Sequence, residues 1–314
     1  MSENILVIKL GALGDFIQAA APFAAIRAYH HRSTITLLTT LPFAELAVKS
    51  PWFDEVWVDQ RPKSYDLAGW LELRSRLRGG RFTRAYDLQT SSRTGRYFKL
   101  FWPDPAPDWS GIARGCTLPH DNPTRDFMHT VERQAEQLAM AGLPAPSAPD
   151  FSWVQGDTSR FNVHERFVIL VPGGAPHRPA KRWPVESYHA LAMEVAAMGL
   201  QPVVVGSASE RSLGEEVLAG CDTGENLAGQ TNLEDLLLLA RDANGAVGND
   251  TGPIHIFAAQ GCRTLVLYSS ASDPALCAPK GGIVTILRRE RLQNLSVKDV
   301  AAALSAVNAG QLFQ

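Results

Sequence analysis

The stretch Val247-Gly-Asn-Asp-Thr-Gly-Pro-Ile-His255, followed by Ile256-Phe-Ala-Ala259, decides how the chain folds. Residues 245–248 are small and apolar, as in a short buried strand, and Pro253 directly after Gly252 is typical of the first turn of a helix. The segment therefore predicts a strand, a tight loop and a helix start. In an open α/β sheet such a loop lies at the carboxyl ends of the strands, where ligands bind.

This loop predicts an anionic ligand, because a helix start presents unpaired backbone N–H groups at the positive end of the helix dipole. A diphosphate would contact the amides near Thr251 and Gly252, the Thr251 hydroxyl and the His255 ring. Asp250 would then accept hydrogen bonds from hydroxyl groups that the diphosphate carries. The alternative is an ordinary capped helix with a histidine in the core. A second loop of similar design near residue 10 favours the ligand site.

Length and charge restrict the class of protein. With 314 residues and 45% hydrophobic content, the chain is long enough for two α/β domains with their own cores. The net charge of −2 argues against a dedicated nucleic-acid binder, and no run reaches the roughly 18 apolar residues of a membrane span. The cysteines form no C-x-x-C pair, so we expect a reduced, cytoplasmic protein without a zinc site.

The second glycine loop follows the first apolar run of the chain. Ile5–Ile8 is typical of a buried parallel strand, Lys9-Leu-Gly-Ala-Leu-Gly-Asp15 of a loop, and residues 16–29 of a helix. The loop matches neither the dinucleotide fingerprint nor a Walker phosphate loop. Asp15 therefore has two interpretations. It is the N-cap of the helix, which the spacing alone favours, or a general base that faces a ligand.

Residues 70–100 carry eight basic and two acidic side chains, so this segment is strongly positive within a chain of net charge −2. Such runs are often solvated helix faces. A basic first domain would also attract an anionic substrate and bind its carboxylates or phosphates through arginine side chains. Arg93 and Arg96 are the candidates for this role.

A second α/β domain is predicted after the proline-rich stretch 143–149. Residues 167–171 and 201–205 are its first strands, and each is followed by a glycine-containing loop. Lys181 beside a bound diphosphate would screen the phosphate charge, and Glu210 could bind a ribose diol. Each residue alone is also typical of a solvated loop.

Together these motifs resemble glycosyltransferase family 9, the ADP-heptose:lipopolysaccharide heptosyltransferases. The resemblance covers nearly the whole chain, although residues 60–150 carry no family motif. In chain order the motifs are Lys9-x4-Gly-Asp15, Pro172-Gly-Gly, Lys181-x-Trp-Pro184, Gly206-x3-Glu210, Asn226-Leu-x-Gly229, Asn249-Asp-Thr-Gly-Pro-x-His255 and Ser272-Asp-Pro274.

The resemblance implies an α/β protein of GT-B architecture, with two Rossmann-like, doubly wound domains that face each other across a cleft. It implies an acceptor-binding domain at residues 1–155 and a nucleotide-sugar-binding domain at residues 156–294. Residues 295–314 would form a terminal helix that packs back on the first domain.

The family's roles carry over only where the motifs match. Asp15 is expected to be the catalytic base, while Arg93 and Arg96 are our candidates for contact with the acceptor. No metal and no other cofactor is expected, because the sequence contains no D-x-D motif and a helix dipole, a lysine and backbone amides can stabilise a leaving diphosphate. The expected donor ligands are Lys181, Glu210, Asp250, Thr251, Gly252 and His255.

The function implied is the inverting transfer of a heptose or related sugar from an ADP-sugar to a hydroxyl of a lipopolysaccharide core or other surface glycan. The expected donor is ADP-heptose. The partners would be this donor and an anionic glycan or glycolipid acceptor, with peripheral contact at the inner face of the inner membrane and no nucleic acid. Two alternatives stay open. One is a nucleotide-sugar epimerase or hydrolase of the same fold, and the other is a non-catalytic nucleotide-binding protein.

Overall fold

The computed structural model describes residues 3–308 of the chain, which divide into two compact units between Pro149 and Asp150. The sequence placed this boundary after residue 155. Both positions fall in the stretch 141–166, whose residues form turns and loops. Among residues 3–308, no helix is long and apolar enough to cross a membrane.

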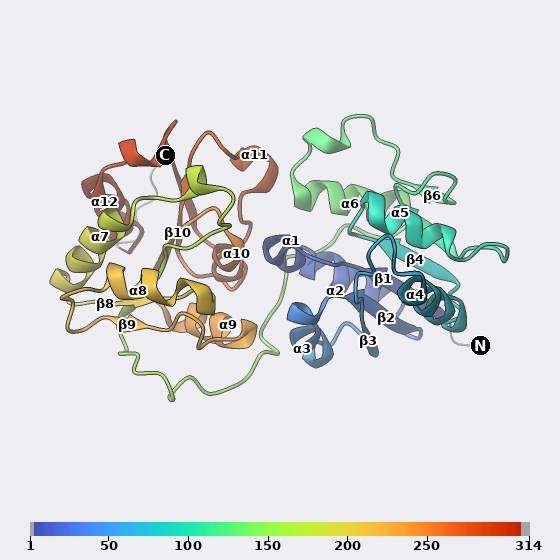
Figure 1. Ribbon diagram of the computed structural model, residues 1–314, viewed down its shortest axis with the longest axis horizontal. Coiled ribbons are helices and arrows are strands. Elements are labelled where there is room, and N and C mark those ends of the chain that lie inside the picture. Colours follow the sequence, from blue (N-terminus) through green and yellow to red (C-terminus); the bar gives the residue numbers. More distant parts are fainter. Residues whose placement is uncertain (1–2, 309–314) are drawn as a thin grey trace. The chain divides into compact units, whose positions relative to one another are not determined.

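The N-terminal unit is built on a parallel sheet of six strands in the order β3-β2-β1-β4-β5-β6 (Figure 1). The order reverses between β1 and β4, which is where ligands bind in doubly wound sheets. The strands are β1 (Asn4–Ile8), β2 (Thr34–Thr39), β3 (Glu55–Val58), β4 (Arg84–Asp87), β5 (Asp108–Gly111) and β6 (Leu118–Pro119). The helices are α1 (Leu13–Gln18), α2 (Ala20–Tyr29), α3 (Leu41–Lys49), α4 (Leu67–Gly79), α5 (Ser92–Lys99) and α6 (Thr130–Met140), with a 3-10 turn at Arg125–Phe127.

The core of this unit explains why the first apolar run becomes a central strand. Residues 5–8 are fully buried, as expected for a parallel strand that is covered on both faces. Leu6 and Ile8 lie in one apolar cluster with Leu77 of α4 and Trp109 of β5. The packing of β1 in this core therefore fixes the position of the glycine loop that follows the strand.

The helix predicted over residues 16–29 is interrupted in the structure. Its first part, α1, begins at Leu13, and α2 begins at Ala20 after a short break at Ala19. Asp15 is thus the third residue of α1 and lies inside its first turn, rather than ahead of the helix.

The C-terminal unit repeats this plan with a parallel sheet in the order β12-β11-β10-β7-β8-β9, which reverses between β10 and β7 (Figure 1). The strands are β7 (Phe167–Val171), β8 (Gln201–Val204), β9 (Glu225–Asn226), β10 (Gly245–Asn249), β11 (Thr264–Tyr268) and β12 (Val284–Arg288). The helices are α7 (Val185–Ala197), α8 (Arg211–Val217), α9 (Leu233–Asp242), α10 (Gly252–Ala259), α11 (Pro274–Cys277) and α12 (Val297–Asn308), with 3-10 turns at Pro179–Lys181, Ala208–Glu210 and Leu292–Asn294. The predicted fold class, α/β with two doubly wound parallel sheets, is confirmed.

The terminal helix α12 packs within the C-terminal unit. Val300, Ala303 and Leu304 are buried in one cluster with Val247 of β10 and Leu191 of α7. One face of α12 thus belongs to the core of the second unit, and the expected contact of residues 295–314 with the first domain stays a prediction. Residues 309–314 lie outside the described part of the chain.

Candidate functional site

In the C-terminal unit, one buried side chain ties together the loops at the carboxyl edge of the sheet. Asn249, the last residue of β10, is fully buried. Its Oδ1 accepts a hydrogen bond from the Trp183 backbone N–H at 3.0 Å, and its Nδ2 donates to the carbonyls of Pro172 at 2.9 Å and Gly173 at 3.1 Å. Asn249 therefore fixes the loop after β7 and the segment before α7 against the end of β10. It belongs to a motif that we quoted, but no role for it was predictable from that motif.

Asp250 is held by two partners directly after this strand. Its side chain is only 7% exposed, and its Oδ2 lies 2.6 Å from the Lys181 ammonium, whose side chain is 15% exposed. Its Oδ1 accepts a hydrogen bond of 3.1 Å from the Tyr268 hydroxyl at the end of β11. Burial and the adjacent Asp250 carboxylate raise the pKa of Tyr268, so this hydroxyl keeps its proton and remains a donor. The structure thus brings Lys181 and Asp250 together.

Tyr268 was not among the predicted site residues. It ends the apolar run of residues 264–268, and side chains at the end of a parallel strand lie at the ligand-facing edge of the sheet. That placement is the signal that could have found it.

The helix start predicted for an anion is present at α10. Gly252 is its first residue, and Thr251 precedes it in extended backbone without capping the helix through its side chain. The Thr251 hydroxyl instead donates to the Asn249 carbonyl at 3.3 Å. His255 follows in the first turn and is 7% exposed. These residues therefore surround one helix N-terminus, where backbone N–H groups can bind an anion.

Glu210 joins two neighbouring loops of the same edge. Its Oε1 accepts from the Gly174 N–H at 2.8 Å, and its Oε2 accepts from the Ser207 N–H at 2.8 Å and hydroxyl at 2.9 Å. A Cβ placed on Gly173 would lie 2.0 Å from Oε1, so any other residue there would displace the Glu210 carboxylate from this position. A Cβ on Gly174 would lie 3.1 Å from Cγ2 of Thr251. The glycine pair therefore lies between Glu210 and the α10 start.

In the N-terminal unit, a pocket of about 550 Å³ opens where the strand order reverses. The loop after β1 is tied to the loop after β4 by a hydrogen bond of 2.8 Å from the Leu10 N–H to the Gln89 side-chain oxygen. The pocket is lined by Leu10, Gly11, Ala12, Thr40, Pro42, Phe43, Arg61, Gln89, Ser91, Ser92 and Arg93.

Asp15 lies one turn of α1 beyond this pocket's Gly11 and Ala12. Its side chain accepts a long hydrogen bond of 3.3 Å from the Ala12 N–H, and the residue is partly exposed. The carboxylate thus reaches back to the start of its own helix, as a cap does. With only this long bond recorded within the described part of the chain, its oxygens keep lone pairs for a further donor.

A buried cation lies behind this loop. Lys9 is 3% exposed and donates to the Leu88 carbonyl at 3.1 Å. Burial lowers the pKa of Lys9 to about 8; the Asp15 and Asp87 carboxylates oppose this shift, while Arg133 adds to it. Burial also raises the pKa of Asp87, at the end of β4, to about 6. Lys9 therefore supplies positive charge beside the Asp15 loop.

The two predicted acceptor arginines are placed differently. Arg93 lines the pocket, and its guanidinium donates to the Pro62 carbonyl at 3.2 Å and lies 5.8 Å from the centre of the Trp70 ring. Arg96 is exposed on α5 and is not among the residues that line the pocket. A further arginine, Arg61, lines the pocket but was missed. Its position shortly after β3, at the same sheet edge, was the available signal.

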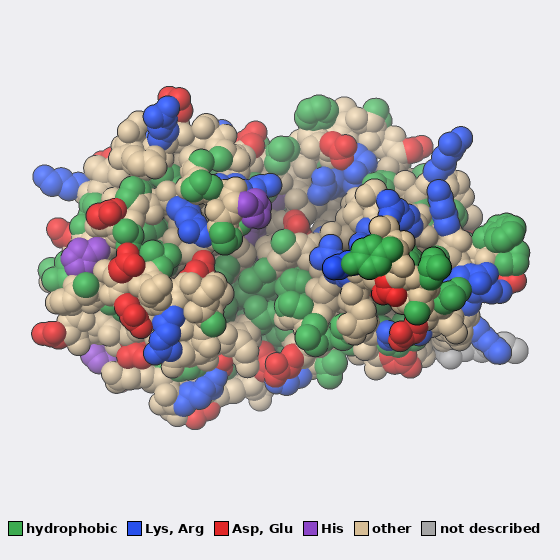
Figure 2. All heavy atoms as spheres, in the orientation of Figure 1, with side chains coloured by type: hydrophobic (Ala, Val, Ile, Leu, Met, Phe, Trp, Pro, Cys, Tyr) green, Lys and Arg blue, Asp and Glu red, His purple; other side chains and the backbone are tan. Residues whose placement is uncertain are grey.

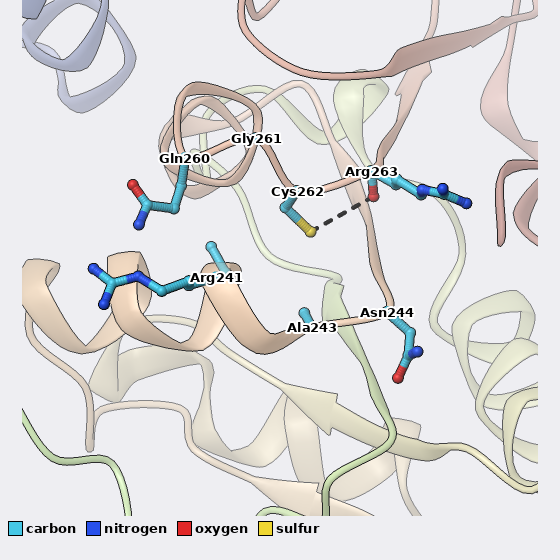
Figure 3. A pocket seen from close by; sticks show the side chains of 8 residues that line it. Arg241, Ala243, Asn244, Gln260, Gly261, Cys262 and Arg263 are labelled. Carbon is cyan, nitrogen blue, oxygen red and sulfur yellow. Dashed lines mark hydrogen bonds between the residues drawn. The ribbon is translucent and has the colours of Figure 1, made fainter. Parts of the chain in front are cut away.

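A second hollow, of about 410 Å³, lies at the opposite edge of the C-terminal sheet (Figure 3). It is formed by the segments that precede β10 and β11 and by the C-terminal ends of α9 and α10. Helix C-termini carry the negative end of the dipole, and Arg241 and Arg263 border them here. None of the predicted site residues lines this hollow. Within residues 3–308, no cluster of three or more His, Cys, Asp or Glu side chains is placed to hold a metal ion.

Comparison with known proteins agrees with this arrangement. The model of the family described as "Glycosyltransferase family 9 (heptosyltransferase)" matches residues 70–303. Lipopolysaccharide heptosyltransferase 2 of Escherichia coli (strain K12) is 36% identical over 307 residues, which cover 91% of this chain and 88% of that protein.

Solved structures share the fold. A family 9 glycosyltransferase from Veillonella parvula superposes with a TM-score of 0.82 at 19% identity, covering 98% of each chain. The E. coli heptosyltransferase WaaC, solved with ADP, superposes with a TM-score of 0.78 at 18% identity, covering 97% of this chain and 99% of that one. The family match begins within the segment where we recognised no motif and includes every donor-loop motif described above. Since it spans well over half of the residues, the chain belongs to glycosyltransferase family 9, the heptosyltransferases.

Proposed function

We propose that this protein transfers a heptose from ADP-heptose to a hydroxyl of a lipopolysaccharide-core acceptor, with inversion at the transferred carbon. The observation that carries the proposal is the pair of carboxylates at equivalent sheet edges. Asp15 adjoins a pocket bordered by arginines, and Asp250 is ion-paired beside a helix N-terminus. The E. coli relative is named a lipopolysaccharide heptosyltransferase, and E. coli WaaC was solved with ADP.

Asp15 would act as the general base. It would take the proton of the acceptor hydroxyl while the hydroxyl oxygen forms a bond to C1 of the heptose. The bond between C1 and the diphosphate oxygen breaks on the opposite face, and ADP leaves with the bonding electrons. The long hydrogen bond from Ala12 leaves Asp15 able to accept this proton.

The donor would bind at the carboxyl edge of the C-terminal sheet. The amides at the start of α10, the Thr251 hydroxyl and the Lys181 ammonium would contact the diphosphate, and His255 would border it. Asp250 would accept hydrogen bonds from the heptose hydroxyls. Glu210 would bind the ribose through lone pairs that its three present donors leave unused.

The acceptor would bind in the N-terminal pocket. Arg61 and Arg93 border this pocket and would hold anionic groups of the acceptor, since guanidinium groups pair well with carboxylates and phosphates. Arg96 would contact more distant parts of a large acceptor from its exposed position on α5. A glycolipid acceptor would bring the protein to the inner face of the inner membrane as a peripheral protein.

No metal or other cofactor takes part in the proposed reaction. The charge that develops on the leaving diphosphate would be stabilised by Lys181 and the α10 amides. The donor would carry no metal-bound diphosphate, because the nearest carboxylate, Asp250, is already paired with Lys181.

The test is to incubate the purified protein with a panel of nucleotide sugars and a heptose-deficient lipopolysaccharide, and to identify products by mass spectrometry. We expect the acceptor to gain one heptose only with ADP-heptose, and Asp15→Asn to form this product about 10²- to 10⁴-fold more slowly. Release of free heptose or of an epimerised donor without an acceptor would favour the hydrolase or epimerase. Binding of ADP without any turnover would favour the nucleotide-binding protein.

A further inference from the structure

The N-terminal unit exposes a mixed apolar and basic surface, of which only Arg96 has a role in the proposed reaction. Four large apolar side chains of this surface are largely exposed: Tyr65 by 75%, Leu67 by 74%, Leu71 by 62% and Trp102 by 76%. We call this surface the α4–α5 face. It consists of Tyr65, Leu67, Leu71, Arg96, Lys99 and Trp102.

Contacts beneath the α4–α5 face show that these residues form one surface. The Trp70 ring of α4 packs edge-on against the Tyr97 ring of α5, with ring centres 5.9 Å apart. Arg74 of α4 donates to the carbonyls of Leu100 at 3.1 Å and Trp102 at 2.8 Å. The two helices therefore lie side by side, and Trp102 continues the surface from the end of α5.

The spacing of the exposed residues is that of two helix faces. Leu67 and Leu71 are four residues apart on α4 and share its outer side, whereas Leu73 and Leu77 of the same helix are buried. Arg96 and Lys99 are three residues apart on the exposed side of α5. Leucines thus occupy the outer side of α4, where a soluble helix would carry polar residues.

Basic side chains outnumber acidic ones in the segment that contains the apolar side chains, and the exposed Glu72 adjoins Leu71 on α4. Residues 61–102 contain ten basic and three acidic side chains, and one of the acidic ones, Asp87, is buried. Figure 2 shows hydrophobic and Lys or Arg side chains next to one another over the part of this unit that α4 and α5 form. Since the whole chain has a net charge of −2, this concentration of positive charge is local.

We propose that the α4–α5 face docks on an anionic phospholipid bilayer. Leu67, Leu71 and Trp102 enter the headgroup region, where aromatic and aliphatic side chains of interfacial helices lie. Arg96 and Lys99 contact lipid phosphates, to which basic side chains are attracted. The proposal rests on the proposed function in that a lipid-anchored acceptor would be reached from this surface.

Charge also argues against a second copy of the chain as the occupant. A two-fold contact would place the same patch on both partners, and Arg96 and Lys99 would then face basic residues of the same surface. A bilayer rich in anionic lipid presents the opposite charge over a wide area and accepts apolar side chains as well.

The test is co-sedimentation with vesicles of phosphatidylethanolamine and phosphatidylglycerol, compared with vesicles of phosphatidylcholine alone. We expect the wild-type protein to bind the anionic vesicles more tightly. Leu67→Glu with Leu71→Glu should lower the vesicle partition coefficient at least about tenfold, since burial of two leucines is lost and two negative charges are added. The matched control is Val48→Glu with Met193→Glu, which adds the same charges at other exposed apolar positions and should bind like wild type.

The charged half of the face is tested separately. Arg96→Gln with Lys99→Gln should weaken binding to the anionic vesicles and leave binding to phosphatidylcholine unchanged. High salt should weaken wild-type binding in the same way, because exposed charges are screened over about 10 Å at 0.1 M salt. Equal binding of both vesicle types by the wild-type protein would overturn the proposal.

Turnover measured with a delipidated, water-soluble acceptor tests the proposed function without requiring the protein to bind a bilayer. The Leu67→Glu, Leu71→Glu variant should keep wild-type turnover with that acceptor and lose vesicle binding, whereas Asp15→Asn should do the reverse. Vesicle binding by the leucine variant equal to that of wild type would refute the bilayer assignment. So would a wild-type dimer in sedimentation velocity that the leucine variant converts to a monomer, because the face would then be a protein interface.

Discussion

The two units place a carboxylate at the same kind of position and treat it in opposite ways. Asp15 lies in the first turn of the helix that follows β1, and Asp250 lies between the end of β10 and the start of α10. Asp250 is held by a lysine at 2.6 Å and a tyrosine at 3.1 Å, and its side chain is 7% exposed. Asp15 is partly exposed and has a single long bond to its own helix.

This difference separates two chemical tasks. A general base must accept a proton from a substrate, so it needs free lone pairs and some freedom to move. A residue that orients a sugar must stay in one place, because a fixed acceptor selects one arrangement of hydroxyl groups. One loop design therefore serves either task, depending on whether neighbouring side chains hold the carboxylate.

The largest expected effect comes from the loosely held carboxylate. Asp15→Asn should lower kcat by about 10²- to 10⁴-fold, the usual cost of losing a general base. ADP affinity, measured by calorimetric titration, should not change, because no ADP ligand is assigned to the N-terminal unit. Full turnover by this variant would show that Asp15 only caps its helix, and the two carboxylates would then not differ in catalytic role.

The ion pair of the other unit can be broken from the lysine side. Lys181→Met should lower kcat by about 10²- to 10³-fold, as does the loss of one group that stabilises transition-state charge. It should also lower the thermal midpoint, because a nearly buried Asp250 loses its counter-charge.

Adding Asp250→Asn to Lys181→Met sharpens this test. The double variant should recover thermal stability without recovering turnover, since the neutral amide that replaces the carboxylate needs no cation beside it. If Lys181→Met alone has wild-type stability and turnover, the pair does not hold the site together.

Substitutions of Thr251 and Asp250, neighbours in the donor loop, should have different effects on ligand binding. Thr251→Val should weaken ADP and ADP-heptose alike, by roughly 0.5–3 kcal/mol for one lost hydrogen bond. Asp250→Asn should not weaken ADP binding, since it removes only the internal partner of Lys181. It should weaken binding of the sugar donor and turnover, because its carboxylate is assigned to the heptose. Calorimetry with both ligands decides this. Equal loss of ADP affinity in both variants would make the loop a general diphosphate clamp.

The smallest expected effect is that of chelation. Activity should be unchanged by EDTA, because Lys181 occupies the carboxylate that a metal ion would otherwise use. Steady-state rates before and after dialysis against EDTA provide the measurement. Loss of turnover that Mg²⁺ or Mn²⁺ restores would show that Asp250 binds a metal, and the contrast between the two carboxylates would need a different explanation.

The sequence predicted the parts of the fold that carry uninterrupted apolar runs. Strands β1 and β7, and the loop from β10 into α10, were predictable because buried parallel strands are apolar throughout and helix starts favour Gly-Pro. The strands β4 and β5 were not recognised, because Arg84-Ala-Tyr-Asp87 and Asp108-Trp-Ser-Gly111 are short and carry charged ends. The break at Ala19 precedes Pro22, which has no N–H to donate to the Gln18 carbonyl, and this signal was not used.

The site was predictable only at the level of motifs. Lys181 and Asp250 are 69 residues apart in the chain, and their ion pair depends on the sheet order that places β10 beside β7. The same holds for the Tyr268 bond to Asp250. The Glu210 brace depends on Gly173 and Gly174 packing against it, which a loop sequence does not reveal. Arg96 was predicted from the local charge, but charge alone does not distinguish an exposed arginine from one that lines the pocket.

The Lys181–Asp250 pair also bears on how the enzyme finishes each cycle. A lysine without a partner of its own would bind the ADP diphosphate tightly and would retain ADP after the sugar has been transferred. Here the ammonium has an alternative partner 2.6 Å away within its own chain. If Lys181 binds the diphosphate as proposed, ADP would compete with Asp250 for that charge. The internal carboxylate would then favour release of ADP and would pair with the lysine again once ADP has left.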